Sequence, residues 1–109
     1  MDIADWRKQI DVLDCRLVEL LNERARAAQE IGKLKRNTSM PIYEPQREKF
    51  VFDNVRRVNR GPLPDSDLLQ VYERIIDVTR KIQKEEITPS RRESDGSAEF
   101  DNGSERLKP

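Results

Sequence analysis

Histidine is absent from this chain of 109 residues, and cysteine occurs once, as Cys15. Without histidine the chain can build no histidine-based triad and no imidazole general base, and one cysteine cannot complete a zinc site. A single cysteine also forms no disulfide within the chain, which favours a reducing compartment. We therefore expect a cytoplasmic protein that uses neither a metal nor another cofactor.

Long apolar runs are missing too. No stretch approaches the roughly 18 residues that a membrane-spanning helix needs, and no charged-then-apolar leader is present. Lys and Arg total 21, as do Asp and Glu, so no overall field attracts nucleic acid or an anionic membrane. With 35% hydrophobic and 39% charged residues, the chain has little apolar surface for a monomeric core. We expect a small, soluble oligomer that binds neither nucleic acid nor membranes.

What the sequence does contain is a long amphipathic pattern. Residues 2–36 include no proline and repeat apolar side chains every three or four positions, which predicts one helix capped by Asp2 or Asp5. Such a helix measures about 50 Å, whereas a compact body of this size is about 30 Å across. Its own chain cannot cover it, so we predict an intertwined helical homodimer.

Two shorter helices follow. Pro45 suits the first turn of a helix that runs to about residue 60, and Asp65 or Ser66 suits the cap of another that ends before Pro89. The predicted fold class is therefore all-α, with one long and two shorter helices in a domain of residues 1–87. Ser, Gly and charged residues dominate positions 88–109, where we expect a disordered tail.

Polar residues interrupt the apolar faces of all three predicted helices. Arg24 and Lys35 lie on the inward side of the first, Arg47 on that of the second, and Thr79 and Gln83 on that of the third. Burying an unpaired guanidinium or ammonium group costs several kcal/mol, so such residues need a carboxylate partner or a bound anion. A single inward cation is readily explained by a long side chain that reaches past the core edge to solvent. The recurrence of inward polar residues on three helices instead favours a ligand site.

The spacing of the cations limits which of them share that site. Arg24 and Lys35 are 11 residues apart, nearly three turns, so they point the same way about 16 Å apart. Arg7 precedes Arg24 by 17 residues, about 25 Å, and is turned by about 100°, so it can take part only from another subunit. Such a pocket suits a small dicarboxylate that also carries a hydroxyl group. No nucleophile is evident, and a rearrangement without proton transfer fits best.

Three ordered motifs contain these residues: Arg7-x-x-Ile10-Asp11-x-x-Asp14-x-x-Leu17-x-x-Leu20-Leu21-x-x-Arg24, then Ile31-Gly32-x-x-Lys35, then Pro41-x-x-Glu44-x-x-Arg47-Glu48. In this order they closely resemble the all-helical chorismate mutases over roughly residues 5–86. Members of that family are intertwined dimers that convert chorismate into prephenate by a [3,3] pericyclic rearrangement, on the route to phenylalanine and tyrosine.

The resemblance implies a role for each matching residue. Arg24 and Arg47, with Arg7 from the other subunit, are similar to the residues that bind the substrate carboxylates. Lys35 and Gln83 are similar to the pair that contacts the ether oxygen, where the bond breaks. Developing charge on that oxygen would be stabilised by Lys35 more in the transition state than in the ground state. The implied catalytic residues are thus Lys35, Gln83 and Arg24.

The remaining substrate-binding positions are implied in the same way. Glu48 would accept the substrate hydroxyl, with Glu44 and Thr79 nearby. Glu44 stands where relatives often have Asp and Thr79 where Ser is familiar, and both keep the chemical type. Some relatives carry a glutamate in place of Gln83, which must be protonated to donate, whereas an amide donates at any ordinary pH.

Two other functions remain open from the sequence. An isochorismate pyruvate lyase resembles the mutases in fold and uses a similar basic pocket for a related pericyclic step, although the spacing and Gln83 fit the mutase better. The chain could instead be a non-catalytic dimerisation or regulatory module, in which case the basic residues would be dispensable.

Overall fold

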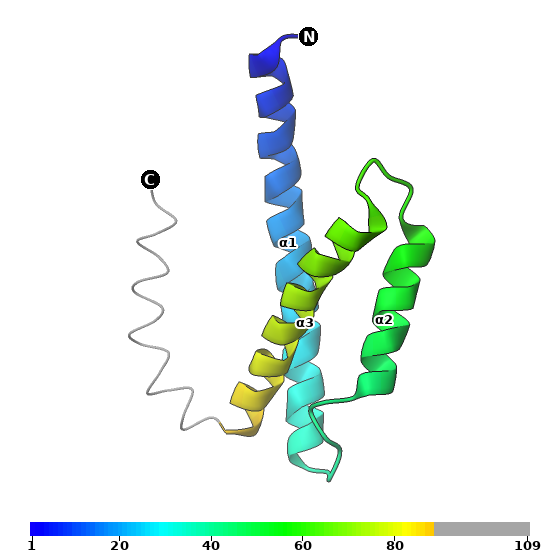
Figure 1. The fold of residues 1–109 in the computed structure, drawn as a ribbon. Helices are drawn as coiled ribbons and strands as arrows, with labels where there is room; N and C mark the ends of the chain where they lie inside the picture. The colour runs from blue at the N-terminus through cyan, green and yellow to red at the C-terminus, as the bar shows by residue number, and fades with distance from the viewer. Residues whose placement is uncertain (89–109) are drawn as a thin grey trace.

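The computed structural model describes residues 1–88, which form three helices and no strand (Figure 1). They are α1 (Ile3–Arg36), α2 (Pro45–Val58) and α3 (Asp65–Ile87). The predicted all-α fold with one long and two shorter helices is confirmed. None of these helices is long and apolar enough to cross a membrane. Apart from Thr88, the predicted tail lies outside the described residues.

The start of α1 agrees with the predicted cap. Asp2 accepts a hydrogen bond from the backbone N–H of Asp5 at 3.0 Å, and the Asp5 carboxylate accepts one from the backbone N–H of Asp2 at 3.2 Å. This reciprocal capping box satisfies donors that the first turn of a helix leaves unpaired. At the other end, Asn37 donates its backbone N–H to the carbonyls of Leu34 and Lys35.

The prediction that Asp65 or Ser66 caps the third helix is wrong. The N-cap is Pro64, and no side chain satisfies the first turn of α3. The Asp65 carboxylate instead accepts a hydrogen bond from Asn59 Nδ2 at 2.7 Å, and the same amide group donates to the Leu63 carbonyl at 2.9 Å. Asn59 lies directly after α2. Asp65 therefore stabilises the turn between α2 and α3 and does not cap the first turn of α3.

Helix α3 lies between the other two and packs against both. Within residues 1–88, no Cα atom of α1 comes within 8 Å of one in α2. Helix α1 approaches α3 closely at Gly32, where an added Cβ would lie 3.0 Å from the Cα of Gln83 and 2.9 Å from the Cβ of Glu86. Only glycine fits this crossing, which brings Lys35, one turn further along, beside α3.

The interior of the single chain is small and unusually polar. Its buried apolar residues are Ala28, Val55 and Ile76, and its buried polar residues are Lys35, Gln83 and Glu86. A chain that buries as many polar as apolar side chains gains little from the hydrophobic effect. The position of these polar groups therefore calls for a functional explanation.

The first half of α1 is not covered by its own chain. It extends past α3 in Figure 1, and its apolar side chains are largely open to solvent: Ile10 is 54% exposed, Leu13 54% and Leu17 53%. Large contiguous apolar faces of this kind mark a surface that another protein covers. The observation agrees with the length argument, while the second subunit itself stays a prediction.

Candidate active site

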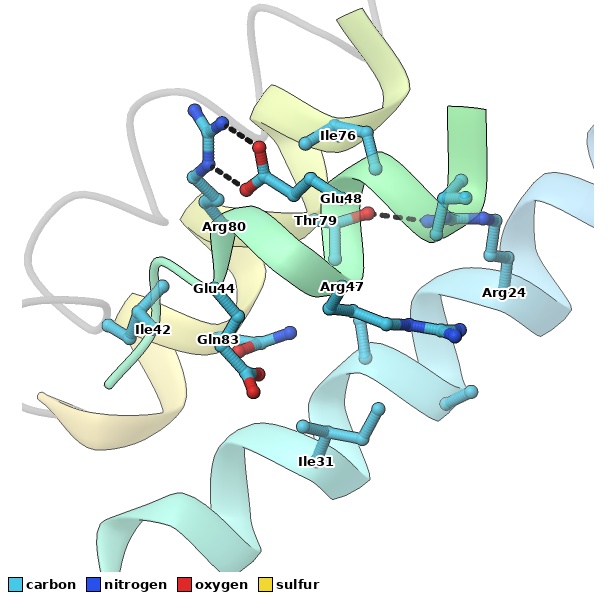
Figure 2. A pocket seen from close by; sticks show the side chains of 13 residues that line it. Arg24, Ile31, Ile42, Glu44, Arg47, Glu48, Ile76, Thr79, Arg80 and Gln83 are labelled. Carbon is cyan, nitrogen blue, oxygen red and sulfur yellow. Dashed lines mark hydrogen bonds and ion pairs between the residues drawn. The ribbon is translucent and has the colours of Figure 1, made fainter. Parts of the chain in front are cut away.

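A cavity of about 290 Å³ opens between α1 and α2, with α3 forming its floor (Figure 2). Its position follows from the packing, because α3 holds the two other helices apart. Apolar side chains make up part of the wall. These apolar residues are Ala27, Ala28, Ile31, Ile42, Val51 and Ile76.

The structure brings most of the sequence-predicted site residues to this cavity. Lys35 is not part of its wall, but it touches two residues that are. Arg7 does not line the cavity either, because it lies about 25 Å before Arg24 along α1. The predicted residues that line it are Arg24, Glu44, Arg47, Glu48, Thr79 and Gln83.

Lys35 lies at one end of the cavity with two partners. Its ammonium group donates to Glu44 Oε2 at 2.7 Å and to Gln83 Oε1 at 3.0 Å, and the residue is only 4% exposed. A buried ammonium requires such acceptors. Because Gln83 accepts through its oxygen, its NH₂ group is oriented away from Lys35 and can donate to a ligand. Lys35 and Gln83 thus present two kinds of N–H donor at one place.

Two further cations reach the cavity without an acidic partner. Arg24 Nη1 donates to Thr79 Oγ1 at 2.5 Å, and that hydroxyl donates to the Ile75 carbonyl at 2.9 Å. Arg47, expected on an inward face, is exposed, and its guanidinium carbon lies 5.3 Å from the centre of the Phe50 ring. Within residues 1–88 neither arginine forms an ion pair. Figure 2 shows them on the same side of the cavity, one from α1 and one from α2.

Glu48 is held by a residue that the sequence analysis missed. Arg80 Nε donates to Glu48 Oε2 at 2.7 Å, and Arg80 Nη2 donates to the other carboxylate oxygen (Figure 2). This two-point contact with Glu48 raises the pKa of Arg80 above its usual range. Arg80 also lies over the Tyr43 ring, at 5.2 Å from its centre, and donates to Asp77 at 3.1 Å.

The position of Arg80 in the sequence of α3 could have indicated that it belongs to the site. It precedes Gln83 by three residues, so these two side chains lie on the same side of the helix. The Arg80 side chain is 38% exposed, because the Glu48 carboxylate and the Tyr43 ring cover part of it.

The model of the family described as "Chorismate mutase type II" matches residues 6–84, which include all of α2 and most of α1 and α3. This chain belongs to the chorismate mutase type II family. The family resemblance seen in the sequence is confirmed, and the matched residues lie within the predicted domain of residues 1–87.

Relatives within the chorismate mutase family include both long and short proteins. A bifunctional chorismate mutase/prephenate dehydratase of Aquifex aeolicus is 34% identical over 87 residues, covering 76% of this chain but 24% of that protein. A chorismate mutase of Methanocaldococcus jannaschii is 27% identical over 84 residues, covering 76% of this chain and 85% of its own length. This chain therefore spans about a quarter of the first relative and most of the second.

Solved chorismate mutase structures have the same fold. One from Thermus thermophilus superposes with a TM-score of 0.73 at 30% identity, covering 75% of this chain and 93% of that one. One from Helicobacter pylori, in complex with prephenate, has a TM-score of 0.71 at 28% identity and covers 79% and 93%.

Proposed function

We propose that this chain is a chorismate mutase, an isomerase that converts chorismate into prephenate by a concerted [3,3] rearrangement. One C–O bond breaks and one C–C bond forms within the same molecule, so the reaction needs no proton transfer, nucleophile or cofactor. The protein has to hold a flexible dicarboxylate in its reactive shape and place positive charge where negative charge develops.

The observation that carries this proposal is the charge pattern of the cavity. Lys35 is paired with Glu44 and Arg80 with Glu48, so each of these cations is compensated. Among residues 1–88, Arg24 and Arg47 remain as two guanidinium groups that form no ion pair. Guanidinium groups bind carboxylates through two parallel hydrogen bonds. A ligand with two carboxylates compensates both.

The chemistry takes place at the opposite end of the cavity. Lys35 Nζ and the Gln83 amide are 3.0 Å apart and converge on the position that we assign to the ether oxygen. Negative charge grows on that oxygen as its bond to carbon breaks, and a buried ammonium stabilises it strongly because little water screens the charge. Glu48 accepts the substrate hydroxyl, while Glu44 and Thr79 complete the polar wall.

We further propose that the active unit is a homodimer in which Arg7 reaches the cavity of the partner subunit. The exposed apolar face on the first half of α1 supports a two-fold contact, and the length of α1 keeps Arg7 away from its own chain's cavity. Arg7 of the partner subunit would then provide a third guanidinium group for binding the dicarboxylate. A cytoplasmic location stays a prediction that rests on the single cysteine.

The direct test is to incubate the purified protein with chorismate and follow the loss of chorismate absorbance together with prephenate formation. We expect saturable conversion to prephenate without added metal or cofactor. The same preparation is then given isochorismate, and released pyruvate is measured. Faster release of pyruvate from isochorismate than rearrangement of chorismate would favour the lyase, and inactivity on both substrates would favour a non-catalytic module.

Gln83 gives this function a pH signature. An amide has no proton to lose near neutrality and the chain has no histidine, so kcat/KM is expected to change less than about twofold between about pH 6 and pH 8. In Gln83→Glu the side chain donates only when protonated, so activity should be highest at acid pH and fall as the pH rises through the pKa of the introduced carboxyl. Initial rates across the pH series test both statements. A steep profile in the unaltered protein, or a flat one in Gln83→Glu, would contradict the role given to Gln83.

A further inference from the structure

Arg80 is the one cavity residue whose charge the proposed reaction does not use. It comes from α3, at the edge of the cavity where α2 and the segment before it meet α3. Figure 2 shows its guanidinium directed at the Glu48 carboxylate, with one N–H···O contact to each carboxylate oxygen, which is the pattern of a bidentate pair. An arginine that binds an acid facing a ligand can fix the position of the carboxylate and neutralise its charge.

Arg80 is itself fixed from two other directions. Its Nη1 donates to Asp77 Oδ1 at 3.1 Å, one turn earlier on α3, and its guanidinium carbon lies 5.2 Å from the centre of the Tyr43 ring. A planar guanidinium that stacks on a ring and donates a hydrogen bond from one edge has little freedom. A group bound at its Nε–Nη2 edge is therefore held in a defined position.

Glu48 is the residue bound at this Nε–Nη2 edge. Its side chain is 16% exposed, less than the 38% of Arg80, so the acid faces the cavity from a largely buried position. Each carboxylate oxygen has two acceptor sites. One contact to Arg80 at each oxygen therefore leaves acceptor capacity for a hydroxyl group in the cavity.

We propose that Arg80 is a positioning residue for Glu48, one that fixes the carboxylate as the acceptor for the substrate hydroxyl and cancels its charge. The proposal rests on the function proposed above. A free carboxylate in a cavity that takes a dianion would repel the substrate, and the guanidinium removes this repulsion while leaving the acceptor in place. Arg80 acts only through Glu48 and touches no reacting atom.

The experiment is a double-mutant cycle read as KM and kcat for chorismate. Arg80→Gln is expected to raise KM about tenfold and to change kcat less than about threefold, because the hydroxyl contact and the charge balance act mainly on binding. In a Glu48→Gln background the same substitution should alter KM less than about twofold, since no charged acid remains to be held. Lys84→Gln, an equal charge change one turn later on an exposed site, serves as the control and should leave both constants unchanged.

Arg80→Lys keeps the charge but not the two-point contact, and should recover part of the loss in KM while the protein keeps its normal unfolding temperature. An equal rise in KM from Arg80→Gln in both backgrounds would overturn the proposal. So would an Arg80→Lys variant that recovers none of the loss in KM and has a lowered unfolding temperature. Absence of turnover in the unaltered protein would instead refute the proposed function, so the two failures are distinguishable.

Discussion

Replacing Lys35 by alanine is expected to lower kcat/KM for chorismate by about a thousandfold, most of it in kcat. The ammonium is 4% exposed and hydrogen-bonded to both Glu44 and Gln83, so it is already in place before charge develops. Donors that need no reorganisation during the reaction contribute most to stabilising a transition state. No other cation lies within hydrogen-bond distance of Gln83 among residues 1–88, and alanine offers no donor.

A loss of this size has to be separated from unfolding. Glu44 keeps a side chain that is 35% exposed, so water can solvate its carboxylate once Lys35 is gone, and the helices should persist. Circular dichroism and thermal unfolding measure this directly. Lys33→Ala is the matched control, because Lys33 lies two residues earlier on α1 and forms an ion pair with Glu30 on the surface. If folded Lys35→Ala turns over chorismate as fast as Lys33→Ala, the catalytic end of the cavity has been assigned wrongly.

Heterodimers that combine Arg7→Ala in one chain with Lys35→Ala in the other are expected to recover about half of the normal activity per dimer. Each homodimer of either variant should be nearly inactive. In the mixed dimer, the chain with an intact Lys35 receives an intact Arg7 from its partner, which restores one complete cavity. The other cavity lacks both residues. Two inactive proteins would thus yield one working site.

The measurement requires co-expression with two different affinity tags and purification over both, so that only mixed dimers are assayed. Dimers made from Arg7→Ala and unaltered chains calibrate the activity of a single intact site, which should also be about half. If Arg7 served its own chain's cavity, each cavity of the mixed dimer would carry one defect and activity would stay near zero. A monomer in solution at assay concentrations would also contradict the shared site.

Much of this protein could be predicted from residue order alone. The long proline-free pattern and the Asp2 cap predicted α1, and Pro45 predicted the start of α2, because periodicity and helix ends are local properties of the chain. Local spacing also showed Arg24 and Lys35 on an inward face. The family followed from the order of these motifs, and the placement of Arg7 far from its own cavity followed from the rise of one helix.

The tertiary structure decided which groups meet. Lys35 pairs with Glu44 and Gln83 because α1 crosses α3 at Gly32, a contact that no local pattern specifies. Arg80 holds Glu48, 32 positions away in the chain, although a sequence with 21 acidic side chains offers many alternatives. Charge attraction alone does not distinguish one acidic side chain from another. The helix crossings and the lengths of the side chains therefore determine which ion pairs form. That is why the sequence predicted the existence of an anion site, whereas only the packed helices determined which cations remain unpaired within it.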